Sequence, residues 1–543
     1  FKVADRVHQV RGYDISNMSI IEGESGWIIV DPLTSRETAA AALALAREHL
    51  GDKPIVAVIF THSHIDHFGG IFGVITEQQY RDGKVRIIAP EGFLEEATSE
   101  NIIAGIAMGR RAIYMYGRDL ARSERGHVGS GLGKGPAFGT FGIVEPTEII
   151  DSTPQEKTID GLTFVFQNAP ASEAPAELTF GVPELGVYCG AEIATRTMHN
   201  LYTLRGTKIR DALKWSGYID EMIELSKGAE VYFASHHWPV WGRERIVSYL
   251  EQQRDTYKFI HDQTVRLFNE GFTPREIAER LELPAALRDG FANRGYYGTV
   301  KHNAKAVYQG YLGWYDANPA NLDSLPPVEA GRRYVELAGG ADAMLQKARD
   351  AYERGDYRWT AEMLSHLVFA QPDNAAAKSL LANTYDQLGY QAESGPWRDV
   401  YLAAAYELRH GVPSEMVDIA TMGEVLRRTP VDKFFQSLSV RLDAEKAEGV
   451  DMSVAVTFTD LQQSYLLSVR NSVMHHRETA APVAANASLL LTRELFVRML
   501  TRDAGLRETL TSDELEVEGS VLDLVRFFRL FSNPDGLFNI VTP

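Results

Sequence analysis

The residues in this sequence that most clearly could bind a metal or take part in catalysis are the histidines and the aspartate of the stretch THSHIDH, residues 61 to 67. They directly follow the apolar run IVAVIF, which is typical of a buried strand. In an extended segment His62 and His64 point to the same side, whereas Asp66 and His67 are adjacent and precede FGG, which permits a sharp turn. Neutral imidazole nitrogens and carboxylate oxygens are ligands that Zn²⁺ takes in proteins. A single loop histidine is usually solvated, but this spacing predicts two pairs of ligands for two neighbouring metal ions.

Strand-like runs that end in polar or turn-forming residues recur through the first half of the chain. From residue 1 to about 250 they alternate with helical stretches; examples are WIIVDP, VRIIAP, LTFVFQNAP, GVYCGAE and AEVYFASHHW. The alternation predicts an α/β layered domain whose polar loops gather along one sheet edge. The glycine-rich stretch from 105 to 147 is predicted to be a long loop or lid, because so many glycines do not hold a helix or a strand together.

Helical spacing replaces this alternation after the turn-rich segment GWYDANPANLDSLPP, residues 313 to 327. Gly355 and Gly389 lie 34 residues apart, each beside tyrosines. This period is typical of tetratricopeptide helix pairs, although a helical bundle used for packing or dimer contacts is the more general interpretation.

A third pattern begins at about residue 425, where period-two strands precede helical segments and predict an α+β module. We therefore divide the chain into an α/β domain (1–320), an all-α helical domain (328–424) and an α+β domain (425–543).

Length, charge and cysteine content exclude several classes of protein. A chain of 543 residues exceeds what one hydrophobic core supports, which agrees with several domains. The formal net charge of −18 argues against nucleic acid as a partner, because phosphate contacts need clustered Lys and Arg. The longest apolar runs are far shorter than the ~20 residues that cross a bilayer, so we expect no stable membrane insertion. The single cysteine, Cys189, excludes an intrachain disulfide framework.

The motif H-x-H-x-D-H resembles the signature of the metallo-β-lactamase superfamily, which supplies ligands to a two-metal site. The upstream segment GWIIVDP, which contains Asp31, is similar to an early strand of that superfamily. The resemblance implies an αββα sandwich and further ligands at later strand ends. The segments NAPASEAPAE and GVYCGAEIA carry glutamates where most members have a histidine and an aspartate. With glutamate in both places, the chain resembles the alkyl sulfatase branch, whose members hydrolyse long-chain alkyl sulfates such as dodecyl sulfate.

This narrower resemblance extends over nearly the whole chain. HNLYTLRG, RDALKW, SHHWPVWG and RGYYGTVKHNAKAVYQGYLGWYDANP all resemble segments of the alkyl sulfatases. The three-part layout is similar too, with a catalytic domain, a helical dimerisation domain and a C-terminal domain like sterol carrier proteins. The resemblance implies a homodimer. It also implies a periplasmic or secreted bacterial protein, with a signal peptide that is not part of the given chain.

The resemblance also implies two Zn²⁺ per chain, held by seven ligands. It assigns His62, His64 and Glu173 to one ion, Asp66, His67 and His237 to the other, and Glu192 to both. Two alternatives stay open, namely His236 in place of His237 and Glu177 in place of Glu173. Two such ions lower the pKa of a shared water toward 7. Among the ligands, Asp66 is also predicted to be catalytic.

A sulfate anion needs directed donors, and an arginine fork matches its oxygens better than lysine does. Arg205, with Asn200 and Thr203 in the same segment, is the predicted cradle and Arg205 is also counted as catalytic. His302 and Tyr308 are secondary candidates for catalysis, through contacts with the sulfate or the leaving group.

The alkyl tail needs an apolar channel, since each buried methylene contributes about 0.8 kcal/mol. Aromatic residues in and beside the glycine-rich stretch are candidates for its lining: Tyr114, Tyr116, Phe138 and Phe141.

The resemblance thus implies zinc-dependent hydrolysis of primary alkyl sulfate esters, which are anionic surfactants, to the alcohol and inorganic sulfate through a metal-activated water. Two alternatives stay open: a lactonase or thioesterase of the same superfamily, and a surfactant or lipid carrier with a structural metal site.

Overall fold

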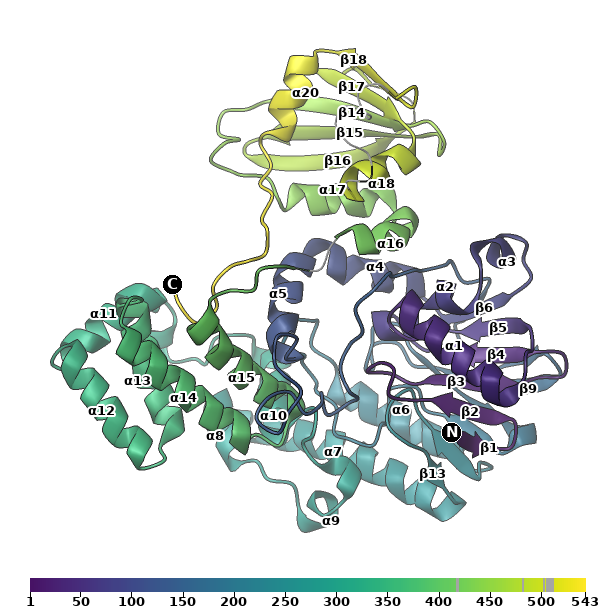
Figure 1. Cartoon of the computed structure of the whole chain (residues 1–543), viewed down its shortest axis with the longest axis horizontal. Coiled ribbons are helices and arrows are strands. Elements are labelled where there is room, and N and C mark those ends of the chain that lie inside the picture. Colours follow the sequence, from purple (N-terminus) through teal and green to yellow (C-terminus); the bar gives the residue numbers. More distant parts are fainter. Residues whose placement is uncertain (417–418, 481–482, 502, 504–511) are drawn as a thin grey trace.

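Two β-sheets face each other in the first half of the chain (Figure 1), whose computed structural model describes residues 1–416, 419–480, 483–501, 503 and 512–543. The first sheet has seven strands in sequence order: β1 (Lys2–Ala4), β2 (Val7–Val10), β3 (Met18–Glu22), β4 (Trp27–Val30), β5 (Ile55–Ile59), β6 (Arg86–Pro90) and β7 (Glu148–Ile150). The second sheet has six strands in reverse sequence order: β13 (Val240–Trp241), β12 (Val231–Phe233), β11 (Val187–Cys189), β10 (Leu178–Val182), β9 (Leu162–Asn168) and β8 (Gln155–Ile159).

Apolar side chains from both sheets fill the space between them. Ile28 and Ile59 of the first sheet are fully buried in one cluster with Phe164, Phe180 and Phe233 of the second. Helices cover the two outer faces. The helices on the first sheet are α1 (Arg36–Leu50) and α2 (Ile71–Val74), and those on the second are α6 (Ala212–Leu225), α7 (Arg243–Asn269) and α10 (Val300–Leu312). The predicted αββα sandwich is confirmed.

The topology brings several loop ends to one edge of the sandwich. β4 and β5 are parallel neighbours, and so are β11 and β12, so the carboxyl ends within each pair lie together. The loop between β9 and β10 of the second sheet contacts the segment that follows β5 of the first. Ser63 N–H donates to Ala176 O at 3.2 Å, and Leu178 N–H donates to Thr61 O at 2.8 Å. The segment after β5 is therefore held against the loop before β10.

The glycine-rich stretch is only partly a loop, which corrects the prediction for 105–147. Its first eleven residues form helix α5 (Gly105–Met115), and irregular structure follows up to β7. Only Gly105 and Gly109 fall within this helix, and its other residues favour helix or tolerate it. The denser glycines that prevent regular structure begin at Gly117.

Helices dominate the middle of the chain, to the left in Figure 1. They are α11 (Pro327–Leu337), α12 (Ala341–Glu353), α13 (Tyr357–Ala370), α14 (Ala375–Gln391) and α15 (Gly395–His410). Gly355 lies between α12 and α13 with φ +77°, whereas Gly389 lies inside α14. A Cβ at Gly389 would come within 2.8 Å of Leu402, so this glycine permits close packing of α14 on α15. The two glycines therefore do not mark equivalent positions of a repeat.

The C-terminal region is a five-stranded sheet with helices, as predicted from its sequence. Its strand order is β16 (Val473–Thr479), β15 (Gln463–Arg470), β14 (Met452–Phe458), β17 (Ala487–Leu491) and β18 (Leu515–Gly519). Its helices are α16 (Gly423–Arg428), α17 (Val431–Ser439), α18 (Arg493–Thr501) and α20 (Val521–Phe528). Further α-helices of the described residues are α3 (Glu77–Arg81), α4 (Phe93–Ile103), α8 (Pro274–Arg280) and α9 (Ala285–Arg288). Cys189 is a buried free thiol in β11. Within the described parts of the chain, no helix is long and apolar enough to cross a membrane.

The last residues return from the C-terminal sheet to the helical region, as the yellow trace in Figure 1 shows. Arg110 of α5 and Glu407 of α15 form a buried ion pair there. Arg110 Nε also donates to Phe538 O at 2.9 Å, and Ile540 N–H donates to Glu407 Oε1 at 3.1 Å. One ion pair thus joins the two-sheet part of the chain, the helical part and the C-terminal tail.

The substitution Glu407→Ala is expected to lower stability strongly, because it leaves the buried Arg110 guanidinium without its carboxylate, at a cost of about 3 to 5 kcal/mol. Thermal unfolding followed by calorimetry measures the effect. Arg266→Ala is the control, since it removes an exposed ion pair with Glu270 that contributes at most about 1 kcal/mol. Equal melting temperatures for the two variants would contradict this role of the buried pair.

Candidate metal centre

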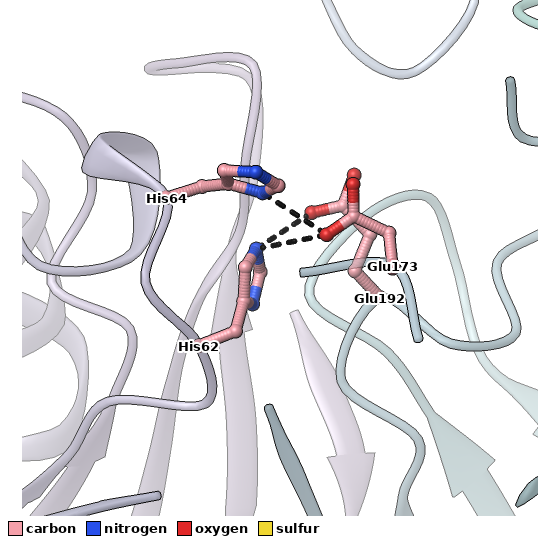
Figure 2. A group of neighbouring side chains, drawn as sticks. All are labelled: His62, His64, Glu173 and Glu192. Atoms are coloured by element: carbon pink, nitrogen blue, oxygen red, sulfur yellow. Dashed lines mark ion pairs between the residues drawn. The ribbon is translucent and has the colours of Figure 1, made fainter. Parts of the chain in front are cut away.

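Two groups of histidine and carboxylate side chains meet at the sheet edge described above. The first group is His62, His64, Glu173 and Glu192, and the second is Asp66, His67, Glu192 and His236. Within each group the ligand-type atoms all lie within 4.8 Å of one another. Figure 2 shows the first group, in which the two histidines of the segment after β5 point toward two glutamates from loops of the second sheet. Glu192 belongs to both groups, in the bridging place that the family resemblance implies.

The spacing of these atoms fits metal ligands. His62 Nε2 lies 3.1 Å from Glu192 Oε2, and His64 Nδ1 lies 3.0 Å from Glu173 Oε2. His67 Nε2 and His236 Nε2 are each 3.1 Å from Glu192 Oε2. Two ligands of one tetrahedral Zn²⁺ stand roughly 3.3 to 3.6 Å apart at the usual bond lengths.

Four of the buried ligand-type atoms have no hydrogen-bond partner among the described residues. They are Nε2 of His62, His67 and His236, and Oε2 of Glu173. A buried polar atom without a partner costs about 1 to 3 kcal/mol, so a cluster of four requires an explanation. Divalent cations that accept the lone pairs of these four atoms would explain the cluster. The set of donor atoms therefore fits two metal ions.

Asp31 orients the histidines of the motif. It follows β4 with φ +56° and is buried, and its Oδ2 accepts hydrogen bonds from His67 Nδ1 at 2.9 Å, Thr61 Oγ1 at 2.8 Å and Ser235 Oγ at 2.6 Å. Thr61 Oγ1 accepts in turn from His62 Nδ1 at 2.9 Å. Because Nδ1 carries the proton in both rings, the lone pair of Nε2 faces the centre.

His236, and not His237, joins the second group, which corrects the predicted ligand. His236 Nδ1 donates to Ile15 O at 2.9 Å, and its Nε2 faces Glu192. His237 has φ +61° and points the other way, with Nε2 at 3.1 Å from Gly131 O. Burial and the neighbouring His236 lower the pKa of His237 to about 4. Consecutive residues at a strand end point in opposite directions, so only one of the two can reach the centre.

Glu173 occupies the first group, and Glu177 braces the loop behind it. Glu177 Oε2 accepts from Ser172 Oγ at 2.8 Å and Ala174 N–H at 3.1 Å, and its Oε1 accepts from Glu192 N–H at 3.2 Å. Burial and the charges of Glu173 and Glu192 raise the pKa of Glu177 well above the ordinary value. Glu177 thus fixes the backbone of the two ligand loops.

Arg210 is a central residue that the sequence prediction missed. Its Nη2 lies 2.5 Å from Glu173 Oε1, and its Nη1 donates to Asn200 Oδ1 at 2.6 Å. Burial alone would raise the pKa of Glu173, but the charges of Arg210 and His64 outweigh it and lower that pKa to about 2. His199, also missed, places Nε2 at 2.9 Å from Glu192 Oε1. The available signal was a second arginine in the polar loop that carries Arg205, immediately before the helix-capping residue Asp211.

The predicted anion cradle lies beside this arginine. Asn200 and Thr203 are buried; Asn200 is held by Arg210, and Thr203 Oγ1 lies 3.0 Å from Met115 Sδ. Arg205 is partly buried, its Nη1 donates to Gly206 O at 3.1 Å, and no carboxylate of the described residues pairs with it. Its charge is therefore available to an anion.

Tyr116 lies near Arg205, and Tyr297 lies beside Tyr116. Burial raises the pKa of Tyr116, and the charge of Arg205 opposes that shift. The Tyr116 hydroxyl lies 3.4 Å from that of Tyr297, whose ring contacts His199 with centroids 4.8 Å apart. Burial also raises the pKa of Tyr297 well above its ordinary value, so both hydroxyls stay protonated near neutral pH.

His302 and Tyr308 do not reach the centre, which corrects both candidates. His302 Nε2 contacts Tyr202 O, and its Nδ1 accepts from Trp397 Nε1 at 3.1 Å, so neither ring nitrogen is free. Tyr308 is buried in the core beneath the second sheet and packs edge-on against Phe268 at 5.9 Å. Both lie on α10, and the helix turns them toward packed neighbours.

Of the four aromatic candidates for the alkyl channel, only Tyr116 lies by the centre. Tyr114 packs against Ala403 and Val541, Phe141 is buried in the core under the first sheet, and Phe138 is 56% exposed.

Comparisons with known proteins match the entire chain. Three family models cover successive parts: "Metallo-beta-lactamase superfamily" residues 11–236, "Alkyl sulfatase dimerisation" residues 273–411 and "Alkyl sulfatase C-terminal" residues 420–543. A linear primary-alkylsulfatase from Pseudomonas sp is 46% identical over 100% of this chain and 81% of its own length. An (R)-specific secondary-alkylsulfatase from Pseudomonas sp is 44% identical over 100% of this chain and 82% of its own length. The solved structure of the stereoselective inverting sec-alkylsulfatase Pisa1 from Pseudomonas sp. has a TM-score of 0.95 at 43% identity, covering 100% of this chain and 86% of that chain.

The adjacent histidines give a matched test of the ligand assignment. His236→Ala is expected to lower the affinity of the second group for metal by a factor of about 100 or more, since even outer contacts of ligands contribute 10- to 100-fold. His237→Ala should keep the metal content of the wild type. Metal analysis of dialysed protein by mass spectrometry measures both, and the assignment is wrong if His237→Ala is the variant that loses metal.

Arg210→Met is expected to weaken metal binding at the first group by a factor of about 10 to 100, because Glu173 loses the cation that orients it. Arg210→Lys should restore only part of this affinity, since an ammonium group cannot bond Glu173 and Asn200 as a planar fork does. Competitive titration against a chromogenic chelator measures the affinity. Unchanged affinity in Arg210→Met would show that Glu173 is oriented without the arginine.

Proposed function

The chain belongs to the alkyl sulfatase family of the metallo-β-lactamase superfamily, and on this premise we propose that it hydrolyses alkyl sulfate esters to the alcohol and inorganic sulfate. The observation that carries the proposal is the pair of His/carboxylate groups joined by Glu192. The proposal concerns alkyl sulfates as a class, with linear primary esters such as dodecyl sulfate as the first substrates to test. Relatives named for primary and for secondary esters match at 46% and 44% identity.

We propose that the two groups hold two Zn²⁺ ions. His62, His64, Glu173 and Glu192 would hold one, and Asp66, His67, His236 and Glu192 the other. Mixed imidazole and carboxylate ligands suit Zn²⁺, and Asp31 and Arg210 orient the ligands from behind. Two such ions, when bound, supply positive charge and lower the pKa of water between them toward 7.

The chain itself supplies donors for an anionic head group. Arg205 offers a guanidinium fork, which matches the oxygens of a sulfate, and it has no carboxylate partner among the described residues. The protonated hydroxyls of Tyr116 and Tyr297 add neutral donors from two further segments. Asn200 is fixed by Arg210, so its position is set before substrate arrives.

Positioning and charge neutralisation are the main contributions expected of this site, because sulfate is a good leaving group. The surroundings also exclude bulk water, as His62, His67 and His236 are fully buried. Buried donors of this kind stabilise developing negative charge more strongly than donors in water do.

We also propose a homodimer formed through the helical region and export from the cell. The match of residues 273–411 to a dimerisation family supports the dimer. Exposed apolar side chains of this region support it too, among them Leu337 at 82% and Trp359 at 50% exposure. Export follows from the family resemblance alone.

Release of inorganic sulfate from dodecyl sulfate tests the function directly. We expect turnover by the purified protein, loss of turnover after dialysis against a chelator, and recovery with Zn²⁺ at about two ions per chain. Lactone and thioester hydrolysis are measured beside it, and faster turnover of either would reject the sulfatase. Metal uptake without any turnover would favour a carrier.

A further inference from the structure

The first turn of α15 packs against the loop that follows α5. A Cβ at Gly395 would lie 2.5 Å from the backbone of Ser130, so the helix start and this loop touch directly. Arg398 Nε donates to Gly126 O at 3.0 Å, and its Nη2 donates to Glu124 O at 2.6 Å. We call residues 124–134 the covering segment, because its other side lies against His237 and Tyr297, which are neighbours of the metal centre.

The covering segment reaches the candidate site at two points. Gly131 O accepts from His237 Nε2 at 3.1 Å, directly beside the ligand His236. Leu132 is buried in one small cluster with Met115 and Tyr297. The position of Tyr297, a proposed donor to the sulfate, therefore depends on the covering segment.

His127, within the covering segment, is buried between two hydrogen-bond acceptors. Its Nδ1 lies 2.8 Å from Asp399 Oδ2 of α15, and its Nε2 lies 2.7 Å from Lys134 O. A carbonyl oxygen and an ionised carboxylate carry no hydrogen, so both ring nitrogens must donate when Asp399 is ionised. A neutral imidazole has one N–H, and beside an ionised Asp399 only the imidazolium satisfies both contacts.

We propose that His127 and Asp399 form a charged clamp that holds the covering segment against the metal centre, and that His127 is thereby a positioning residue for binding of the sulfate ester. Asp399 is fully buried, and its Oδ1 has no hydrogen-bond partner among the described residues, so His127 is its main compensation. Burial raises the pKa of Asp399, and the hydrogen bond from His127 and the charges of His127 and Arg398 oppose that shift. Arg122 of the loop opposes the charge on His127.

The clamp makes substrate binding depend on pH. The hydrogen bond to Asp399 raises the pKa of His127, against the effect of burial. A group whose pKa is raised in the folded state stabilises that state fully below its ordinary pKa, about 6.5 for histidine, and loses this effect as the pH rises through the raised value. Above that value a ring lone pair faces an oxygen, and the covering segment loosens.

Hydrogen–deuterium exchange of the full-length protein tests the clamp without using its activity. Exchange of peptides from the covering segment is followed by mass spectrometry from about pH 6 to 9 and corrected for the intrinsic pH dependence of exchange. In the wild type we expect corrected exchange to rise about tenfold across this range, as a charge-assisted hydrogen bond is lost. His127→Gln should show, at every pH, the fast exchange that the wild type shows only at high pH. Asp399→Asn should shift the transition to lower pH, because the carboxylate that favours the imidazolium is gone.

His261→Gln is the matched control. His261 also pairs with an aspartate, Asp262 at 2.8 Å, but its other nitrogen faces the Tyr311 hydroxyl, which can donate as well as accept. This variant should behave like the wild type. A pH-independent exchange in the wild type, or wild-type behaviour of His127→Gln, would overturn the clamp.

The kinetic consequence rests on the proposed function and is measured separately. KM for dodecyl sulfate is expected to rise with pH in the wild type, with a smaller change in kcat, and this rise should be absent in His127→Gln. If the wild type releases no sulfate, the proposed function fails, while the exchange experiment still decides on the clamp.

Discussion

Three carboxylates close to one another, two of them buried, are the constraint on which the rest of this structure depends. Glu173 and Glu192 are buried, Asp66 is partly buried, and the three lie in two groups that share Glu192. Removing one such charge from water costs several kcal/mol, and like charges nearby add to this cost. The Arg210 guanidinium compensates part of this charge through Glu173, and four imidazoles surround the group with ring nitrogens that can bind metal. Divalent cations compensate the remainder in our proposal, so metal binding and folding of this edge are one thermodynamic problem.

The fold meets this constraint by drawing the ligands from four different strand ends. The His62 segment follows β5, the Glu192 loop follows β11, and His236 follows β12. Glu173 comes from the loop between β9 and β10, which pairs with the motif segment through backbone hydrogen bonds. None of these segments holds the centre alone, so the site exists only once the two sheets have packed face to face. The buried Asp31, which bonds to residues after β5 and β12, ties both sheets together at this point.

The part of the site that could be predicted from the sequence is the part that lies within one short segment. H-x-H-x-D-H places four ligands within six residues, and the segment keeps that chemistry in any fold that puts it after a buried strand. His236 and His237 are neighbours of one type, and the choice between them depends on a backbone with φ +61° that no local pattern specifies. Arg210 and Tyr297 act through contacts with residues 37 and 181 positions earlier in the chain, Glu173 and Tyr116. Such partners follow from tertiary packing, which is also why His302 and Tyr308 proved to be packed helix residues.

The helical region has a second role beyond the contacts that its family name suggests. α15 pairs Glu407 with Arg110 of α5 near its end, and it contacts the covering segment at its start. α5 in turn carries Met115, which contacts Thr203, and Met108, whose Sδ lies 3.9 Å from Arg205 Nη1. One helix of the middle region thus supports both the anion donors and the segment that covers them. Because packed helices shift as rigid units, a change at the far side of α15, such as subunit association or movement of the C-terminal tail, would reach Arg205 and Tyr297 together. Such a link gives a physical reason for the three parts to remain in one chain although the metal ligands all come from the first.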